Sequence, residues 1–266
     1  MVGFFDNAYR DGGTPTWDVG QPQGAVVRLA GTGLVTGSVL DAGCGTGENA
    51  LHLAELGHPV LGVDFAVAAI ERAAAKAADR GLPVEFRVAD ALDLAALERT
   101  FNTVLDVGLF HTFEDVERTR YAASLAAALR PGGRAFLLCW SDRNPFGRGP
   151  RRISRREIRE TFREGWQVEA IDPEWLDTRL PDGRIHAWLA RITRVGAGTQ
   201  DADTGAGCGA GARTSRPAAL PASGHAMARS RQAGYAPTVN QPGSQIGPRC
   251  SCRRRVPVQG ARAVGC

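Results

Sequence analysis

Short aliphatic runs alternate with helical patterns between residues 38 and 194. Each run has the length of one buried strand, and most of the stretches between them repeat their apolar residues at helical spacing. This alternation is typical of a parallel or mostly parallel sheet wrapped by helices. The predicted strands are 38–42, 60–64, 84–88, 102–107, 134–140, 166–171 and 185–193, and the predicted helices are 46–56, 66–80, 114–129 and 155–163.

The last two predicted strands differ from the others, because a polar segment with "PDGR" at 181–184 separates them in place of a helix. Parallel strands need a crossover connection, so we expect these two to pair as an antiparallel hairpin at the sheet edge. The sequence therefore predicts an α/β fold. Its core is a seven-stranded, mostly parallel, Rossmann-like sheet with helices on both faces and an antiparallel edge strand.

The N-terminal region, residues 1–37, contains no strand–helix unit. It carries four aromatic residues amid glycine and proline, namely Phe4, Phe5, Tyr9 and Trp17. An aromatic-rich arm of this kind is suited to close over a site. We therefore expect an N-terminal lid or arm at 1–37, followed by an α/β domain at 38–195.

The C-terminal region changes character at Gly196, where Gly, Ala, Pro, Arg and Ser become dominant and Tyr235 is the single aromatic residue among the last 71. Such a segment cannot bury enough apolar surface to offset its conformational entropy, so a disordered tail is predicted at 196–266. The tail holds nine arginines and two aspartates. Although the whole chain has a net charge of +4, residues 1–195 are mildly acidic, with 23 basic and 26 acidic side chains.

The acidic body does not demand a polyanionic partner. The Arg-dense segment 147–160 and the arginines at 253–255 leave nucleic-acid binding as an alternative. However, Arg beside Glu at helical spacing is more typical of an ion-paired, solvated face. Nucleic acid is therefore not the expected partner.

Features that the sequence lacks lead to expectations about cellular location and metal binding. No apolar run reaches the roughly 18 residues of a membrane span, and the N-terminus has no basic and apolar signal pattern, so a cytoplasmic location without a membrane partner is expected. The six cysteines include no CxxC pair. Cys44 and Cys139 are expected to be small apolar fillers, and no metal site is predicted.

The glycine-rich segment after the first predicted strand is the candidate ligand-binding loop. The predicted strand 38–42 contains Asp41 and is followed by Gly43, Gly45 and Gly47 before a helical pattern begins. Glycines in this place let a ligand approach the main chain and the N-terminus of the helix. The spacing G-x-G-x-G lacks the last glycine of the dinucleotide frame G-x-G-x-x-G. Asp41 and Glu48 fit a ligand with a cationic amine or sulfonium better than one with phosphates.

The stretch "LDAGCGTG" at 40–47 resembles motif I of the class I S-adenosylmethionine-dependent methyltransferases, and further pieces follow in that family's order. "VLGVDF" resembles the end of the second strand, "RVADAL" the end of the third, "FNTVLDVGLFHTF" the fourth strand and its loop, and "LRPGGRAFLL" the last parallel strand. The resemblance covers residues 38–194 and implies that S-adenosylmethionine is the cofactor. It implies a methyltransferase domain at 38–195.

The resemblance also implies roles for single residues. Asp64 would bind both ribose hydroxyls of the cofactor, and Asp90 or the amide of Ala91 would read the adenine amino edge. A structural alternative stays open for both Asp64 and Asp90, since either carboxylate is also suited to cap the N-terminus of a helix. The residues implied to bind the cofactor are Trp17, Asp41, Gly43, Gly45, Gly47, Asp64, Phe65, Asp90, Ala91, Asp106 and Val107.

The N-terminal arm resembles that of one group within this family. "YRDGGTPTWDVGQPQGAV" at 9–26 is similar to the opening of methyltransferases related to the thiopurine, tellurite-resistance and small-quinone or heterocycle enzymes. In those relatives the arm lies over the cofactor and shapes the acceptor pocket. Here an extra Thr16 separates Pro15 from Trp17, which changes the register of Trp17 and Asp18.

The implied reaction is an in-line methyl transfer to a small molecule with a sulfur, oxygen or nitrogen nucleophile. Thiolates and heterocyclic nitrogens need no base, whereas a phenol needs one. His111 is the candidate base, with a pocket-lining role as the favoured alternative. Phe110, Phe113, Trp140 and His186 are the expected acceptor-side residues. A nucleic-acid methyltransferase and an NAD(P)-dependent oxidoreductase remain the competing functions, and neither the acceptor nor an oligomeric state can be read from the sequence.

Overall fold

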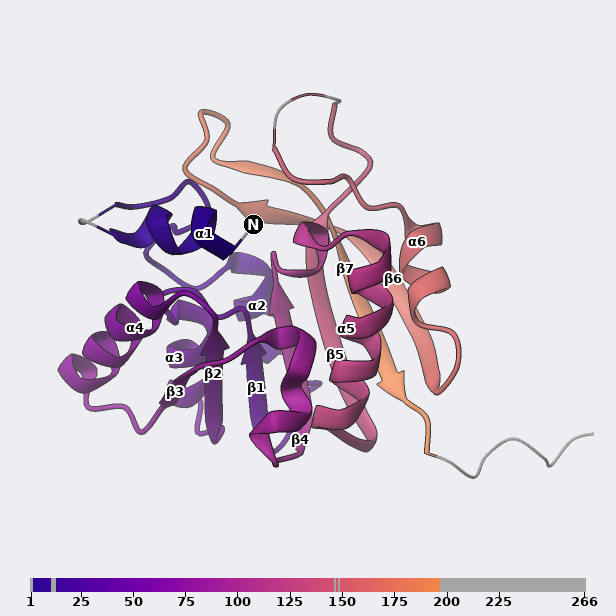
Figure 1. Cartoon of the computed structure of the whole chain (residues 1–266), viewed down its shortest axis with the longest axis horizontal. Coiled ribbons are helices and arrows are strands. Elements are labelled where there is room, and N and C mark those ends of the chain that lie inside the picture. Colours follow the sequence, from indigo (N-terminus) through magenta and orange to yellow (C-terminus); the bar gives the residue numbers. More distant parts are fainter. Residues whose placement is uncertain (1, 11–12, 146, 148, 197–266) are drawn as a thin grey trace, which may run out of the picture. The chain divides into compact units, whose positions relative to one another are not determined.

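The computed structural model describes residues 2–10, 13–145, 147 and 149–196. Apart from Gly196, the tail predicted at 196–266 lies outside the described residues. The seven predicted strands are all present and form one sheet in the order β3-β2-β1-β4-β5-β7-β6 (Figure 1). They are β1 (Val39–Ala42), β2 (Val60–Asp64), β3 (Glu85–Val88), β4 (Phe101–Val107), β5 (Leu129–Trp140), β6 (Trp166–Asp177) and β7 (Arg184–Arg194).

The first five strands are parallel, and the chain changes direction across the sheet at β1. β1 pairs with β2 on one side, Ala42 opposite Val63, and with β4 on the other, Ala42 opposite Asp106. Strand order therefore reverses between β1 and β4. In open α/β sheets this reversal leaves a crevice outside the carboxyl ends of the strands, where ligands bind.

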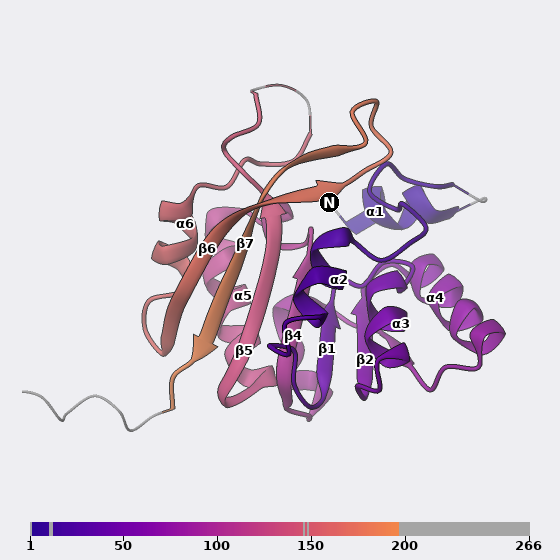
Figure 2. The same ribbon diagram turned by 180° about the vertical axis from the view of Figure 1, so that it is seen from behind.

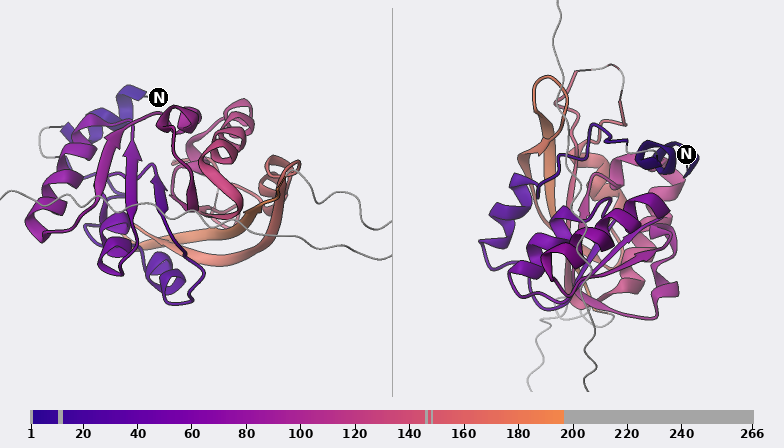
Figure 3. Two further views of the ribbon diagram at one scale, coloured as in Figure 1. Left: turned by 90° about the horizontal axis from the view of Figure 1, so that it is seen from below. Right: turned by 90° about the vertical axis from the view of Figure 1, so that its left-hand side faces the viewer.

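The predicted antiparallel hairpin is confirmed. β7 lies between β5 and β6 and runs antiparallel to both, so the sheet ends in an antiparallel unit. The end of this hairpin projects beyond the carboxyl ends of the parallel strands, toward the N-terminal arm (Figures 2 and 3). The main-chain N–H of Arg179 donates to the carbonyl of Thr16 at 2.7 Å, which joins the two segments.

Helices cover both faces of the sheet, as predicted. α2 (Gly24–Ala30) and α3 (Glu48–Glu55) lie on one face, and α4 (Val67–Arg80) packs against β2 and β3. α5 (Asp115–Ala128) and α6 (Arg155–Thr161) lie on the other face, beside the 3-10 helix η2 (Ala91–Leu97). α1 (Val2–Tyr9) contacts α4, and the short turn η3 spans Phe110–Thr112. No helix in the described part of the chain is long and apolar enough to cross a bilayer.

Part of the region predicted as an arm, 1–37, forms a helix that packs into the core. Residues 24–30 form α2, and Ala25, Val26 and Leu29 are buried, with Val26 and Leu29 in the core formed by α3 and the sheet. Val35 is buried in the same core. The part of the N-terminal region that lies over the crevice therefore ends near Gln23.

Candidate active site

The glycine loop after β1 follows a left-handed path. The φ angle is +72° at Gly43, +53° at Gly45 and +83° at Gly47, values that favour glycine. At Gly47 a side chain is excluded for a second reason, because a Cβ would lie 2.7 Å from the ring of Phe86 and 2.9 Å from Ala73. Gly47 directly precedes α3, so the loop presents bare main chain in front of that helix.

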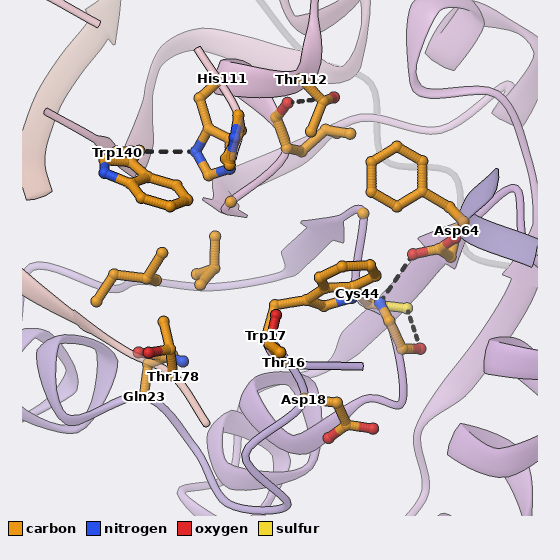
Figure 4. Close-up of a pocket in the computed structure, with 18 of the residues that line it drawn as sticks. Thr16, Trp17, Asp18, Gln23, Cys44, Asp64, His111, Thr112, Trp140 and Thr178 are labelled. Carbon is orange, nitrogen blue, oxygen red and sulfur yellow. Dashed lines mark hydrogen bonds between the residues drawn. The ribbon is translucent and has the colours of Figure 1, made fainter. Parts of the chain in front are cut away.

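Asp64 ends β2 and faces the loop. Its Oδ2 accepts the N–H of Gly45 at 2.9 Å, and its Oδ1 accepts the N–H of Ala66 at 2.9 Å (Figure 4). Burial raises the pKa of Asp64, although these main-chain donors counteract the effect. Each carboxylate oxygen can accept more than one hydrogen bond, so Asp64 can accept a further donor.

A cavity of about 720 Å³ opens beside this loop, within the range of roughly 300–1,000 Å³ that is usual for small-molecule sites. It collects residues from the N-terminal arm, the glycine loop, the ends of β2 and β4, and the β6–β7 hairpin. The predicted site residues that line it are Trp17, Gly43, Gly45, Gly47, Asp64, Phe65, Val107 and His111.

Asp106 and Asp41 lie beneath the cavity floor rather than in its lining. Asp106 is fully buried and accepts hydrogen bonds from the N–H of Leu109 at 3.0 Å, the N–H of Phe110 at 3.2 Å and the hydroxyl of Tyr121 at 2.9 Å. It therefore fixes the loop after β4. Burial raises the pKa of Asp106 to about 7.

Asp41 is as buried as Asp106, but its carboxylate has far fewer hydrogen-bond partners. Neither of its carboxylate oxygens has a hydrogen-bond partner of normal geometry among the described residues, although the main-chain N–H of Ala50 is near enough to lower its pKa slightly. Burial, reinforced by the neighbouring carboxylates of Asp106 and Asp64, raises the pKa of Asp41 to about 7. The protonated and ionised forms of Asp41 are therefore close in free energy near neutral pH.

Asp90 and Ala91 also lie outside the cavity lining. Asp90 is exposed and accepts the N–H of Leu92 at 2.8 Å, which makes it the cap of η2. The carbonyl of Ala91 accepts the hydroxyl of Ser124 at 2.7 Å. Asp90 therefore has the helix-capping role that was the alternative for it, and its implied contact with adenine stays a prediction.

The N-terminal arm places an aromatic cluster over the loop. Ring centres of Phe5 lie 5.5 Å from Trp17 and 6.0 Å from Phe65, and Trp17 lies 6.3 Å from Tyr9. The indole N–H of Trp17 donates to the hydroxyl of Tyr9 at 2.7 Å. This bond fixes the position of Trp17 despite the extra Thr16, and the ring forms one wall of the cavity (Figure 4).

Polar contacts hold the arm at both ends. Near its start, the guanidinium of Arg72 on α4 donates to the carbonyls of Tyr9 and Gly13. Near its end, Gln23 exchanges two side-chain hydrogen bonds with the main chain of Asp177, at 2.7 and 3.0 Å. Sequence reasoning missed these contacts because the partners are 59 to 154 residues apart.

His111 lines the cavity but is not arranged as a base. Its Nδ1 accepts the main-chain N–H of Trp140 at 3.1 Å, and burial lowers its pKa to about 4. A neutral imidazole whose Nδ1 accepts a hydrogen bond carries its proton on Nε2. The general-base role predicted for His111 is therefore not supported by this arrangement, in which His111 offers an N–H donor.

The charges of the cavity lining are mainly acidic. Asp18, Glu48, Asp64 and Glu114 line it, and Arg151 is the only arginine among the described residues of the lining. Glu48 forms ion pairs with Lys76 at 2.8 Å and Arg80 at 2.9 Å, so its charge is largely compensated. Asp64 meets only neutral donors, and its charge favours a cationic ligand at the loop.

The far side of the cavity is apolar. Phe113 and Trp140 contribute as predicted, whereas Phe110 is buried in the core against Tyr121 and Phe162. Sequence reasoning missed the hairpin residues that complete this wall, namely Leu176, Thr178, Leu180 and Ile185. These residues were missed because they flank the polar turn between β6 and β7.

Comparisons with known proteins agree with this geometry. The family model described as "Methyltransferase domain" matches residues 39–133. The chain is 38% identical over 179 residues to the 2-heptyl-1-hydroxyquinolin-4(1H)-one methyltransferase of Mycobacteroides abscessus, covering 64% of this chain and 78% of that protein. It is 30% identical to the probable thiol methyltransferase 2 of Arabidopsis thaliana, covering 60% of this chain and 71% of that protein.

Solved structures give the same result. A structure described as "Conversion of a Disulfide Bond into a Thioacetal Group during Echinomycin Biosynthesis" is 43% identical, with a TM-score of 0.67, and covers 73% of this chain and 93% of that chain. Magnesium protoporphyrin IX methyltransferase from Synechocystis, solved with bound S-adenosylmethionine, shares the fold at 22% identity and a TM-score of 0.51, covering 64% of this chain and 76% of that chain. The chain belongs to the family of S-adenosylmethionine-dependent methyltransferases.

Proposed function

We propose that this protein transfers the methyl group of S-adenosylmethionine to an apolar, aromatic or thiol-bearing small molecule held in the cavity beside the glycine loop. The observation that carries the proposal is the division of one cavity into two chemically different ends. A mainly acidic end with bare main chain lies at Gly45 and Asp64, and an apolar end lies at Phe113, Trp140 and the hairpin.

The residues at the loop fit the cofactor. Asp64 lines the cavity with a buried carboxylate that can accept a further hydrogen bond, and the loop contributes glycines with a left-handed backbone to the same lining. Bound S-adenosylmethionine supplies an electrophilic methyl group on a positively charged sulfur. We assign ribose binding to Asp64, and we assign the aromatic wall over the cofactor to Trp17 and Phe65.

The chain's own contribution to the reaction is positioning and exclusion of water. Methyl transfer from a sulfonium needs the acceptor atom in line with the methyl carbon, and such alignment can supply several kcal/mol, up to about 7–11, of barrier reduction. The arm and the hairpin join through Thr16 and Arg179 and close the cavity from above. The Nε2–H of His111 donates a hydrogen bond to an oxygen or ring nitrogen of the acceptor, which orients the acceptor without a proton transfer.

The relatives support an acceptor of this class. Their names specify a hydroxyquinolone, thiols, demethylmenaquinone and ubiquinone precursors as substrates or pathways. An acceptor that is already ionised, such as a thiolate, needs no base. This requirement matches the cavity, because His111, the only histidine among the described residues of the lining, uses Nδ1 to accept the main-chain N–H of Trp140.

The test combines binding and turnover. Calorimetric titration with S-adenosylmethionine, S-adenosylhomocysteine, NAD⁺ and NADP⁺ is expected to give heat with the first two alone, and heat with a nicotinamide nucleotide alone would overturn the proposal. A radiolabelled methyl-transfer screen over thiols, hydroxyquinolines, quinols, tellurite and RNA is expected to label the first two classes. Label that enters RNA alone would favour a nucleic-acid methyltransferase instead.

A further inference from the structure

A second cavity, of about 440 Å³, lies next to the first and shares two of its walls, Trp140 and Ile185. It is formed by the end of β5, the loop that follows, and the facing ends of β6 and β7. Its lining residues are Trp140, Asn144, Pro145, Arg152, Trp175, Asp182, Arg184, Ile185 and His186. None of these except Trp140 and Ile185 belongs to the site described above.

The walls of the second cavity are fixed by side-chain contacts. The rings of Trp175 and His186 stack with centres 4.4 Å apart. Asn144 accepts the N–H of His186 at 3.0 Å and donates to its carbonyl at 2.6 Å, which holds the loop after β5 against β7. Arg152 stacks over Trp140 at 4.8 Å and donates to the carbonyls of Pro145 and Pro150. These contacts therefore fix the shape of the cavity without a bound ligand.

The second cavity carries a cation without a charged partner. The guanidinium of Arg184 lies 4.3 Å from the ring centre of Trp175, and within the described part of the chain it forms no ion pair or hydrogen bond. Asp182 is the only carboxylate among the described residues of the lining.

We propose that the second cavity binds an anionic substituent of the methyl acceptor, a carboxylate or a comparable oxyanion. The proposal rests on the proposed function, because it places the reacting atom of the acceptor in the first cavity and its charged end beyond Trp140 and Ile185. Arg184 offers a planar pair of N–H donors that matches a carboxylate.

The test measures a preference rather than an activity. Thiophenol and a series of para-substituted thiophenols, in which a carboxylate is attached through zero to three methylene groups, are methylated by the full-length protein. At least one carboxylated member is expected to exceed thiophenol in kcat/KM. In Arg184→Gln the ratio of kcat/KM between that member and thiophenol is expected to fall by about tenfold or more, since a charged hydrogen bond is lost.

Matched variants make the result specific. Arg184→Lys keeps the charge without the planar fork and is expected to restore part of the ratio. Arg156→Gln serves as the control, because Arg156 is highly exposed on α6 and lines neither cavity. A ratio near one in the unmodified protein, or an unchanged ratio in Arg184→Gln, would overturn the proposal.

A binding experiment separates this proposal from the proposed function and from a site for free anions. The same compounds are titrated calorimetrically into the protein saturated with S-adenosylhomocysteine, so the result does not depend on turnover. Tighter binding of a carboxylated member, lost in Arg184→Gln, supports the proposal even if no thiophenol is methylated. Equal affinities overturn it. Benzoate or sulfate that binds through Arg184 without competing with the carboxylated thiophenol would also overturn it.

Discussion

Replacing Gly47 by alanine tests the glycine loop, and Gly57 provides a matched control at the other end of the same helix. Both residues have a positive φ, +83° and +89°. A Cβ at Gly57 meets nothing within 4 Å, whereas a Cβ at Gly47 would lie 2.7 Å from Phe86 and 2.9 Å from Ala73. The two substitutions therefore share the backbone cost and differ in the steric one.

The expected magnitudes follow from these two terms. A left-handed alanine costs about 1–2 kcal/mol in either variant. Overpacking of a well-packed interior costs about 1–3 kcal/mol more, and it applies to Gly47→Ala alone. Gly57→Ala should lower the free energy of unfolding by about 1–2 kcal/mol, and Gly47→Ala by about 2–5 kcal/mol.

Urea unfolding of the ligand-free protein measures both values, and titration with S-adenosylhomocysteine measures the effect on the site. Relief of the clash by movement of the loop should weaken cofactor binding in Gly47→Ala and leave it intact in Gly57→Ala. Equal losses of stability in the two variants would refute the steric argument, since they would show that Phe86 yields at no cost.

Three further predictions concern buried carboxylates and His111. Asp64→Ala should weaken S-adenosylhomocysteine binding by about 1.5–3 kcal/mol in calorimetry, the range of a charged hydrogen bond, and an unchanged affinity would remove the ribose role. Because the pKa of His111 is about 4 when folded and about 6.5 when unfolded, its contribution to stability is present above pH 6.5 and is lost toward pH 4, with a slope of up to about 1.4 kcal/mol per pH unit. Unfolding of His111→Gln across this range should lack that slope, and an unaltered slope would assign it to other groups. For Asp41 the sign is opposite, since its folded pKa of about 7 lies above its unfolded value and its protonated form is favoured in the fold. Asp41→Asn should therefore stabilise the ligand-free protein more at pH 8 than at pH 5, and an equal effect at both would show that Asp41 is ionised without cost.

The central strands of the sheet could be predicted from the sequence because they are short aliphatic runs with buried side chains. Val39–Ala42 and Val60–Asp64 have almost no exposed side chain, so their hydrophobicity alone marks them. α2 was missed because it has only seven residues and no side-chain cap, and packing against α3 and the sheet rather than local preference stabilises it.

The site was predictable at the loop and much less so at the acceptor end. Gly43 to Gly47 and Asp64 lie within 22 positions and carry their signal in spacing. The low pKa of His111 comes from its burial, and its tautomer depends on a main-chain N–H that is 29 residues away, and no sequence pattern records either. The wall supplied by Leu176 and Ile185 depends on how far the hairpin extends beyond the sheet. The cytoplasmic location stays a prediction.

Hydrogen bonds connect the N-terminal arm to the β6–β7 hairpin, where Gln23 and Thr16 bind Asp177 and Arg179 beside the acceptor wall. In the arrangement proposed above, S-adenosylhomocysteine would lie under this arm and would leave when the arm lifts. A change in the hairpin that admits a different acceptor is therefore expected to alter the rate of coproduct release as well.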